Sequence, residues 1–206
     1  MATPLWAFDS GSTGADGAFN PTSSQEIQLP ANGIFNYTTV NIPTGITITY
    51  TPNAANTPVT LLAQGDVVID GVIDVSGQTG GSIDDGLPNN SFVLTPGGPG
   101  GYAGGRGGLP PAGIVGQTDG GTGLGLGGGL GASLCSTSMG GGGSFGTQGG
   151  NDECSSRRSS TYGSTALLPF IGGSGGGGGK SNILLSASGG GGGGCHPHRW
   201  LHYPDR

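Results

Sequence analysis

Glycine is distributed so unevenly along this chain that its two parts cannot fold by the same means. Of the 50 glycines among 206 residues, only 8 lie in residues 1–77, and the other 42 follow. Glycine brings no side chain to a hydrophobic core, and it loses more conformational freedom on folding than any other residue. We therefore expect residues 1–77 to build a core and the glycine-rich remainder to fold by other means or not at all.

The first part has the sequence pattern of short β-strands. Residues 34–42 are rich in β-branched and aromatic side chains, and residues 46–51 alternate strictly between apolar and polar ones, as in a half-buried strand. Shorter apolar runs follow, separated by Gly-Asp and Asp-Gly breaks, at residues 59–63, 67–70 and 72–75. Because no segment of this part shows a 3.6-residue period, the pattern predicts an all-β fold.

The runs after residue 58 favour a short parallel β-solenoid. A unit of strand, Gly-Asp, strand, Asp-Gly and strand suits a coil in which each rung turns a corner and stacks on its neighbour. A hairpin is the alternative, because Asp70-Gly71 is also a good two-residue turn. We favour the solenoid, because the sequence of Val67–Val75 resembles two successive similar faces.

The glycine-rich part, residues 78–194, has two interpretations. A flexible linker is the simpler one, since glycine tracts are costly to order. However, isolated apolar residues interrupt the tracts, which lead into a returning strand near residues 182–188. We therefore predict polyproline II-like insertions, in which three-residue turns pack closely wherever glycine removes the side chain. A mixture, with residues 136–160 mobile, is the third option.

Several motifs of the first part together indicate a family. They are Phe19-Asn20-Pro21-Thr22, the strand segment ending at Ile42-Pro43, and the sequence G-D-V-V-I-D-G-V-I-D-V-S-G of residues 65–77. The chain resembles uncharacterised glycine-rich β-solenoid surface and extracellular proteins of bacteria, in which such a strand block precedes glycine-rich insertions. Residues 18–77 and 172–194 match this plan, and the residues between them match it only in composition. The resemblance implies secretion and a structural surface role, and it supplies no catalytic residue.

The tail, residues 195–206, departs from that plan. It contains all three histidines and no glycine, directly after a run of glycines. A one-base shift in plausible codons can give a strand-like sequence, so we interpret the tail as the frameshifted end of a longer solenoid. Its metal-binding residue types complete no tetrahedral site, so we expect adventitious binding only: Cys195, His196, His198 and His202.

Acidic residues at the glycine-flanked corners are the candidates for calcium binding or catalysis. A row of carboxylates could bind Ca²⁺ or cleave a polysaccharide, with Asp70 and Asp74 the foremost members of the set Asp66, Asp70, Asp74, Asp84 and Asp85. Asp at such corners more commonly caps backbone groups. Since no Lys or Arg precedes Arg106, we expect no enzyme and no cofactor, with calcium as the alternative.

Two further motifs concern cysteine and phosphate. Cys135 and Cys154 enclose a short loop, and a disulfide there would stabilise the fold by roughly 3 kcal/mol; free thiols are the alternative, and Cys195 would be left unpaired. Gly179-Lys180-Ser181 ends like a phosphate-binding loop, but Ser174 stands where that motif opens with glycine. We therefore predict no nucleotide site.

Charge and hydropathy exclude two classes of partner. The net charge is −6 and no basic patch is present, so we expect no nucleic-acid binding. No stretch of about 20 apolar residues occurs, so we expect no membrane span. The first residues lack the pattern of a secretory signal, which weakens the extracellular assignment without removing it.

These expectations combine into a passive extracellular or cell-surface function. We predict a structural protein that builds a surface appendage or filament, or serves as an adhesive scaffold, and that self-associates through its solenoid ends. One alternative is a receptor- or glycan-binding adhesin tip. Another is an ice-binding protein, because Thr47, Thr49 and Thr51 share one strand face.

Overall fold

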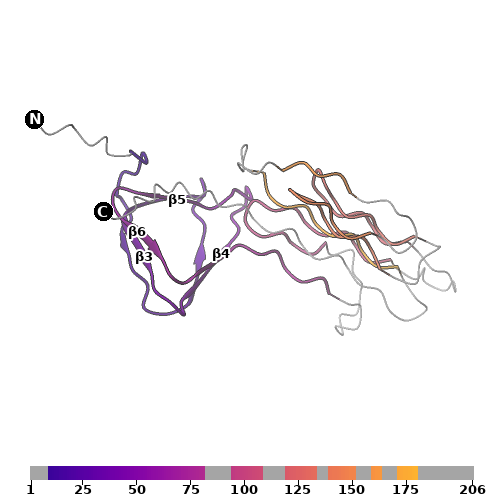
Figure 1. Cartoon of the computed structure of the whole chain (residues 1–206), viewed down its shortest axis with the longest axis horizontal. Coiled ribbons are helices and arrows are strands. Elements are labelled where there is room, and N and C mark those ends of the chain that lie inside the picture. Colours follow the sequence, from indigo (N-terminus) through magenta and orange to yellow (C-terminus); the bar gives the residue numbers. More distant parts are fainter. Residues whose placement is uncertain are drawn as a thin grey trace, which may run out of the picture.

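The chain forms a β-sheet part and a bundle of glycine-rich segments, which lie one after the other along the long axis (Figure 1). The computed structural model describes residues 9–81, 94–108, 119–133, 139–151, 159–163 and 171–180. These residues contain seven β-strands and no helix, so the all-β prediction is confirmed. Over the same residues, nothing resembles a long apolar helix that could cross a bilayer.

The first sheet consists of four parallel strands built around the longest one, β3 (Ile34–Ile42). The others are β1 (Gly17–Phe19) on one side of β3, and β5 (Thr60–Ala63) and β6 (Val67–Ile69) on the other. Tyr37 pairs with Gly17 and Ala63, whereas Val40 pairs with Phe19 and Val67, so the register shifts by one residue on both sides between Tyr37 and Val40. Because both of these β3 residues are buried, the regular alternation of faces breaks at this point.

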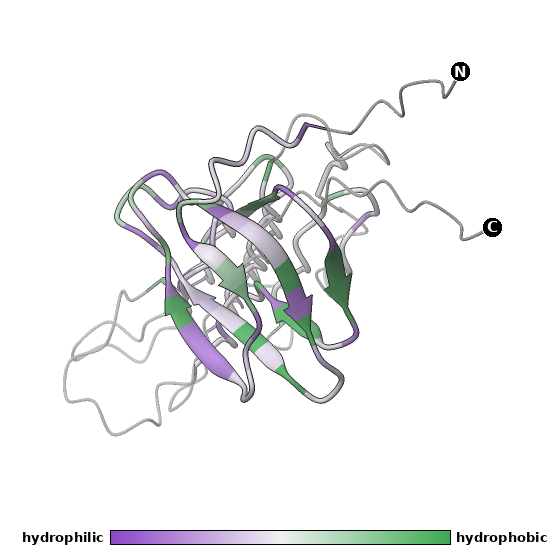
Figure 2. Cartoon of the chain, turned by 90° about the vertical axis from the view of Figure 1, so that its left-hand side faces the viewer, coloured by the Kyte–Doolittle hydropathy of each residue, from purple (hydrophilic) through white to green (hydrophobic). Residues whose placement is uncertain are grey.

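The second sheet has three parallel strands: β2 (Gln25–Gln28), β4 (Thr47–Thr51) and β7 (Val72–Asp74), with β4 in the centre. Ile48 and Tyr50 on β4 are buried, whereas Thr49 between them is exposed. The alternation that predicted a half-buried strand is therefore confirmed. Figure 2 shows the same change between apolar and polar residues along the strands.

The prediction of a parallel β-solenoid is wrong. The described strands form two parallel sheets and do not repeat as equal rungs, because the single strand β3 pairs with both β5 and β6. The hairpin alternative is also wrong, since β6 and β7 do not pair with each other. The reason lies at Gly71, where the amides of Asp70 and Gly71 both donate to the carbonyl of Ile42 at 2.9 Å. A side chain at Gly71 would overlap the carbonyl oxygen of Ile46, so the chain passes closely from one sheet to the other there.

One hydrophobic core joins the two sheets. Its buried members are Leu29, Tyr37, Val40, Ile42, Ile48, Tyr50 and Val59. The ring of Phe35 stacks on Tyr37 of its own strand at 5.6 Å between centroids, and it also contacts the ring of Tyr50 on β4 at 5.7 Å. Burial raises the pKa of the Tyr50 hydroxyl far above its ordinary value, and no hydrogen bond satisfies that hydroxyl. The core is therefore held by aromatic and aliphatic packing between the sheets.

The glycine-rich part is held by backbone hydrogen bonds although it contains no described strand. Segment 171–180 lies at its centre, and the amides of its neighbours donate to it. Residues 102, 105 and 108 donate to the carbonyls of residues 173, 176 and 179 at 3.0, 2.8 and 2.8 Å, and residues 129 and 132 donate to residues 175 and 178 at 2.9 Å. The interval of three residues is the repeat of a polyproline II helix. The described tracts are thus bonded to one another, unlike a linker.

Glycine is needed in this bundle because neighbouring backbones touch. A side chain added at Gly172, Gly175 or Gly178 would overlap a carbonyl oxygen of segment 100–106. These three glycines are again three residues apart, so they form one face of segment 171–180. The glycine content therefore reflects the close approach of the segments.

The side chain of Asn56 connects the sheet part to the bundle. The Asn56 side chain donates from Nδ2 to the carbonyl of Gly101 at 2.8 Å and accepts from the amide of Gly100 at 3.1 Å. A side chain at Gly98 would overlap the carbonyl of Val75, directly after β7. The returning strand predicted near residues 182–188 and the tail of residues 195–206 lie outside the described residues.

Candidate functional site

The predicted row of carboxylates is not gathered into a site. Asp70 follows β6 in the first sheet, whereas Asp74 ends β7 in the second. Asp66 and Asp70 are exposed, and Asp84 and Asp85 lie outside the described residues. Over the residues that the structure describes, no three His, Cys, Asp or Glu side chains group as metal ligands do. Calcium binding stays an untested alternative.

Asp74 caps the backbone at the end of its strand. Its Oδ1 accepts the amide of Ser76 at 2.9 Å. Hydrogen bonds from the side chain and then the backbone of Ser76 lower the pKa of the Asp74 carboxyl below its ordinary value, against a smaller opposing effect of burial. The capping interpretation of corner acids therefore holds for Asp74.

Ser76→Ala should raise the pKa of Asp74 toward its ordinary value, because the side-chain hydrogen bond is the largest cause of the shift. A lowered pKa contributes stability that is present above the pKa of the unfolded chain and is lost as the pH falls through the pKa of the folded one. The variant should therefore lose less stability on acidification. A carboxyl NMR titration checks this, with Thr79→Ala as the control; an unchanged pKa in Ser76→Ala would contradict it.

Hydroxyl groups buried in the bundle were not predicted from sequence. Ser174 Oγ accepts the amide of Gly127 at 2.9 Å and donates to the Tyr162 hydroxyl at 2.9 Å, and this hydroxyl donates to the carbonyl of Gly172 at 2.6 Å. Ser144 and Ser159 form a second pair, with their hydroxyl oxygens 2.6 Å apart. An isolated serine within a glycine tract, as at Ser174, is the signal that could have found such anchors.

The backbone amides of the segment that resembles a phosphate loop already donate hydrogen bonds within the bundle. The amides of Gly175, Gly177 and Gly178 donate to the carbonyls of residues 124, 141 and 121 at 3.0, 2.8 and 2.8 Å. Lys180 at the end of this segment is buried. Because a phosphate loop must offer its amides to the ligand, these glycines cannot cradle a phosphate without opening the bundle.

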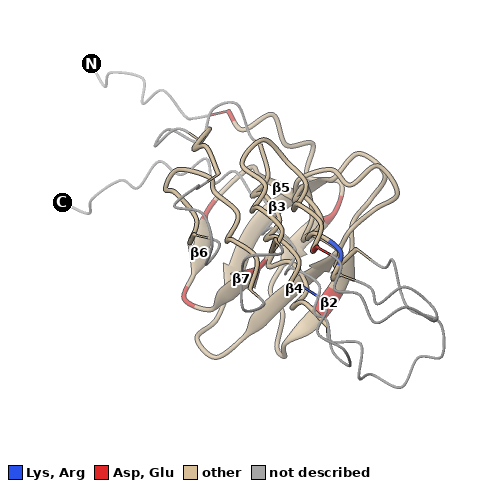
Figure 3. Cartoon of the chain, turned by 90° about the vertical axis from the view of Figure 1, so that its right-hand side faces the viewer, with Lys and Arg blue, Asp and Glu red and all other residues tan. Residues whose placement is uncertain are grey.

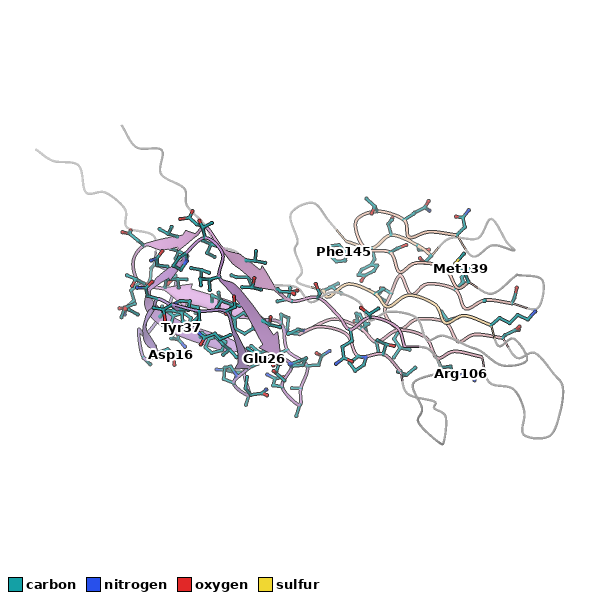
Figure 4. The ribbon with its side chains drawn as sticks, turned by 90° about the horizontal axis from the view of Figure 1, so that it is seen from below. Asp16, Glu26, Tyr37, Arg106, Met139 and Phe145 are labelled. Atoms are coloured by element: carbon teal, nitrogen blue, oxygen red, sulfur yellow. The ribbon has the colours of Figure 1, made fainter. Side chains whose placement is uncertain are left out.

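Apolar side chains stand on the outside of the bundle. The exposed fractions of Leu124 and Leu126 are 45% and 65%, and that of Tyr102 is 36%. A Cβ at Gly125 would lie 2.7 Å from Tyr102 Cδ2, so the tyrosine ring covers the backbone between the two leucines. We call Tyr102, Leu124 and Leu126 the bundle patch. Met139 is exposed at 63% elsewhere on the bundle, and Figure 4 shows it and Arg106 at the outside.

Charge is sparse on the bundle. Within its described segments the charged residues are Arg106, Asp119 and Lys180. Figure 3 shows most of the described acidic residues, coloured red, on the sheet part. The bundle therefore presents apolar and glycine surface with little charge around it.

The threonine face of β4 is interrupted by acids. Thr49 lies between Glu26 of β2 and Asp74 of β7 in the register of the sheet. Thr51 Oγ1 donates to Glu26 Oε1 at 2.5 Å. The three threonines thus share their face with carboxylates, and this arrangement gives no specific support to ice binding.

The remaining predicted residues lie outside the described part of the chain. They are the cysteines of the proposed disulfide, Cys135 and Cys154, and the metal-capable residues of the tail, Cys195, His196, His198 and His202. No known family model, curated protein or solved structure matches the chain. The resemblance to bacterial surface proteins therefore stays a prediction.

Proposed function

We propose that this chain is an extracellular or cell-surface structural protein that serves as an adhesive scaffold. The sheet part is the base, and the glycine-rich bundle projects from it as an arm (Figure 1). The observation that carries the proposal is the bundle patch, formed by Tyr102, Leu124 and Leu126 on a support made of backbone.

The residues that hold the bundle together are different from the apolar residues on its surface. Among the described residues, the buried side chains of the bundle other than Pro99 and Lys180 are small, so its order depends mainly on backbone hydrogen bonds. The apolar side chains are consequently available on the outside, with Leu126 at 65% exposure. Large contiguous apolar patches on a protein surface commonly mark sites of interaction. Adhesion to apolar or uncharged surfaces follows from this composition.

The hydroxyls and the corner acid with resolved contacts take part in holding the fold together. The hydroxyls of Ser144, Ser159 and Ser174 form hydrogen bonds with backbone groups and with other hydroxyls, and these bonds stabilise the bundle. The corner acid Asp74 bonds to Ser76 and lies in a different sheet from Asp70.

Adsorption to a hydrocarbon-coated sensor tests the proposal. The double variant Leu124→Ser, Leu126→Ser should bind at least about tenfold more weakly than the unmodified chain, because each leucine contributes roughly 1.5 kcal/mol or more when fully buried. Thr147→Ser with Gln148→Ser, two exposed positions of the bundle, is the control. Equal adsorption of all three chains would contradict the proposal. Binding to a glycan array that depends on Tyr102 and not on the leucines would favour the adhesin tip instead.

A further inference from the structure

Three β-turns of similar form connect the sheet part to the bundle. They are residues 30–33 between β2 and β3, residues 53–56 between β4 and β5, and residues 98–101 at the start of the bundle. In each turn the amide of the last residue donates to the carbonyl of the first, at 2.9, 2.9 and 2.7 Å. The bundle therefore begins with a turn that the sheet part already uses twice.

Two asparagine side chains join these turns to one another. Asn53 donates from Nδ2 to the carbonyl of Pro30 at 2.6 Å, which joins the second turn to the first. Asn56 donates to the carbonyl of Gly101 and accepts from the amide of Gly100, which joins the second turn to the third. The Asn56 carboxamide thus acts as donor and acceptor at once, so a replacement must supply both to keep the two bonds.

The backbone of Asn56 is unusual for a residue with a side chain. Its φ of 47° is the only positive value among the described residues other than glycine. A Cβ makes this left-handed region costly, although asparagine tolerates it better than most residues. Gly33, the last residue of the first turn, has a φ of 72° at the corresponding position. The position suits glycine, yet the chain places there a residue whose side chain reaches the bundle.

The bundle needs such an anchor more than the sheet part does. The sheet part has its own hydrophobic core, to which Asn56 does not belong. Glycine segments lose much conformational freedom when they become ordered. The third turn leads directly into the bonded segments, because the amide of Tyr102 donates to the carbonyl of Gly173 at 3.0 Å. A side chain at Gly172 would overlap the carbonyl oxygen of Gly100, so fixing this turn also fixes one end of the central segment.

We propose that Asn56 is a latch through which the sheet part keeps the glycine-rich bundle ordered. When the latch is closed, its two hydrogen bonds hold the third turn and the segments bonded to it. When it is open, the bundle loosens from residues 98–102 onward while the core of the sheet part stays folded. This coupling does not depend on what the bundle patch binds, so it goes beyond the adhesive function.

Amide hydrogen exchange of the Asn56→Gly variant, resolved by NMR, tests the proposal. Glycine accommodates the positive φ and removes both side-chain bonds, so the substitution opens the latch without straining the turn. The amides of Tyr102 and Gly105 donate to the central segment and should exchange at least about tenfold faster than in the unmodified chain. The amide of Val40, which donates to Asp66 in the sheet part, should keep its rate.

Ala55→Gly is the matched control, because it adds a glycine at an exposed position of the same turn and leaves the latch in place. A second variant, Asn56→Asp, keeps an acceptor but sets a carboxylate oxygen against the carbonyl of Gly101, so it should also loosen the bundle at neutral pH. The proposal is overturned if either Asn56 variant leaves Tyr102 exchanging as slowly as Ala55→Gly does. Equal acceleration of Val40 and Tyr102 would also overturn it, because the sheet part would then open together with the bundle.

Discussion

Gly178→Ala should destabilise the glycine-rich bundle by about 3 kcal/mol or prevent it from forming. The added methyl group would overlap the carbonyl oxygen and carbon of Arg106. A backbone group cannot rotate away as the end of a side chain can, so segments 100–106 and 171–180 must separate. Their separation breaks the hydrogen bonds that Gly105 and Gly108 donate to the central segment.

Gly146→Ala provides the matched control. Nothing lies within 4 Å of a Cβ at Gly146, so the same chemical change should cost less than about 0.5 kcal/mol there. Thermal unfolding followed by circular dichroism, with amide exchange of the bundle, distinguishes the two variants. Equal stability of Gly178→Ala and Gly146→Ala would contradict the close packing of the segments.

Ile48→Ala should cost about 4 kcal/mol of the free energy of unfolding of the sheet part. Ile48 is fully buried on β4, where it belongs to the core that both sheets share. Its truncation removes apolar contacts and leaves a cavity that the paired strands β2 and β7 can close only in part.

Thr49→Ala is the control for this prediction, because Thr49 is adjacent in sequence and points to the exposed face. It should change the free energy of unfolding by no more than about 0.5 kcal/mol. Urea titration of both variants measures the difference. Similar losses in the two would mean that β4 does not present Ile48 to a core and Thr49 to water.

Strand composition identified most of the sheet part because its signals are local. The β-branched and aromatic residues of β3 and the alternation in β4 are sufficient to recognise a strand. The two earliest strands were missed for a physical reason. β1 has three residues, and β2 has one apolar residue, Ile27, among polar ones. Their pairing with β3 and β4 determines their conformation, and that information is not local.

The arrangement of the strands was harder to predict than their positions. The similar runs on either side of Gly71 favoured a solenoid, whereas the described strands form two parallel sheets of unequal strands. Sequence similarity indicates that both are strands, but the close turn at Gly71 decides where each one goes. Because the strands are short and follow one another closely in the sequence, the sequence pattern did not determine which strands pair.

The glycine-rich part was predictable in its local conformation and not in its pairing. Glycine tracts interrupted by isolated apolar residues indicated close backbone packing with three residues per turn. Glycine has no side chain with which to specify a partner, so the sequence does not say which segment lies at the centre. Ser174, with its bonds to Gly127 and Tyr162, is one of the few side chains that select a partner.

Hydrogen exchange of the bundle amides, resolved by NMR, tests most directly whether the glycine-rich part is an ordered bundle held by its backbone. The amides of Tyr102, Gly105 and Gly108 donate to segment 171–180, so they should exchange far more slowly than amides of an unstructured glycine chain. Protection should recur at the same interval of three residues in the neighbouring segments. Exchange of all three amides at the unstructured rate would contradict the account.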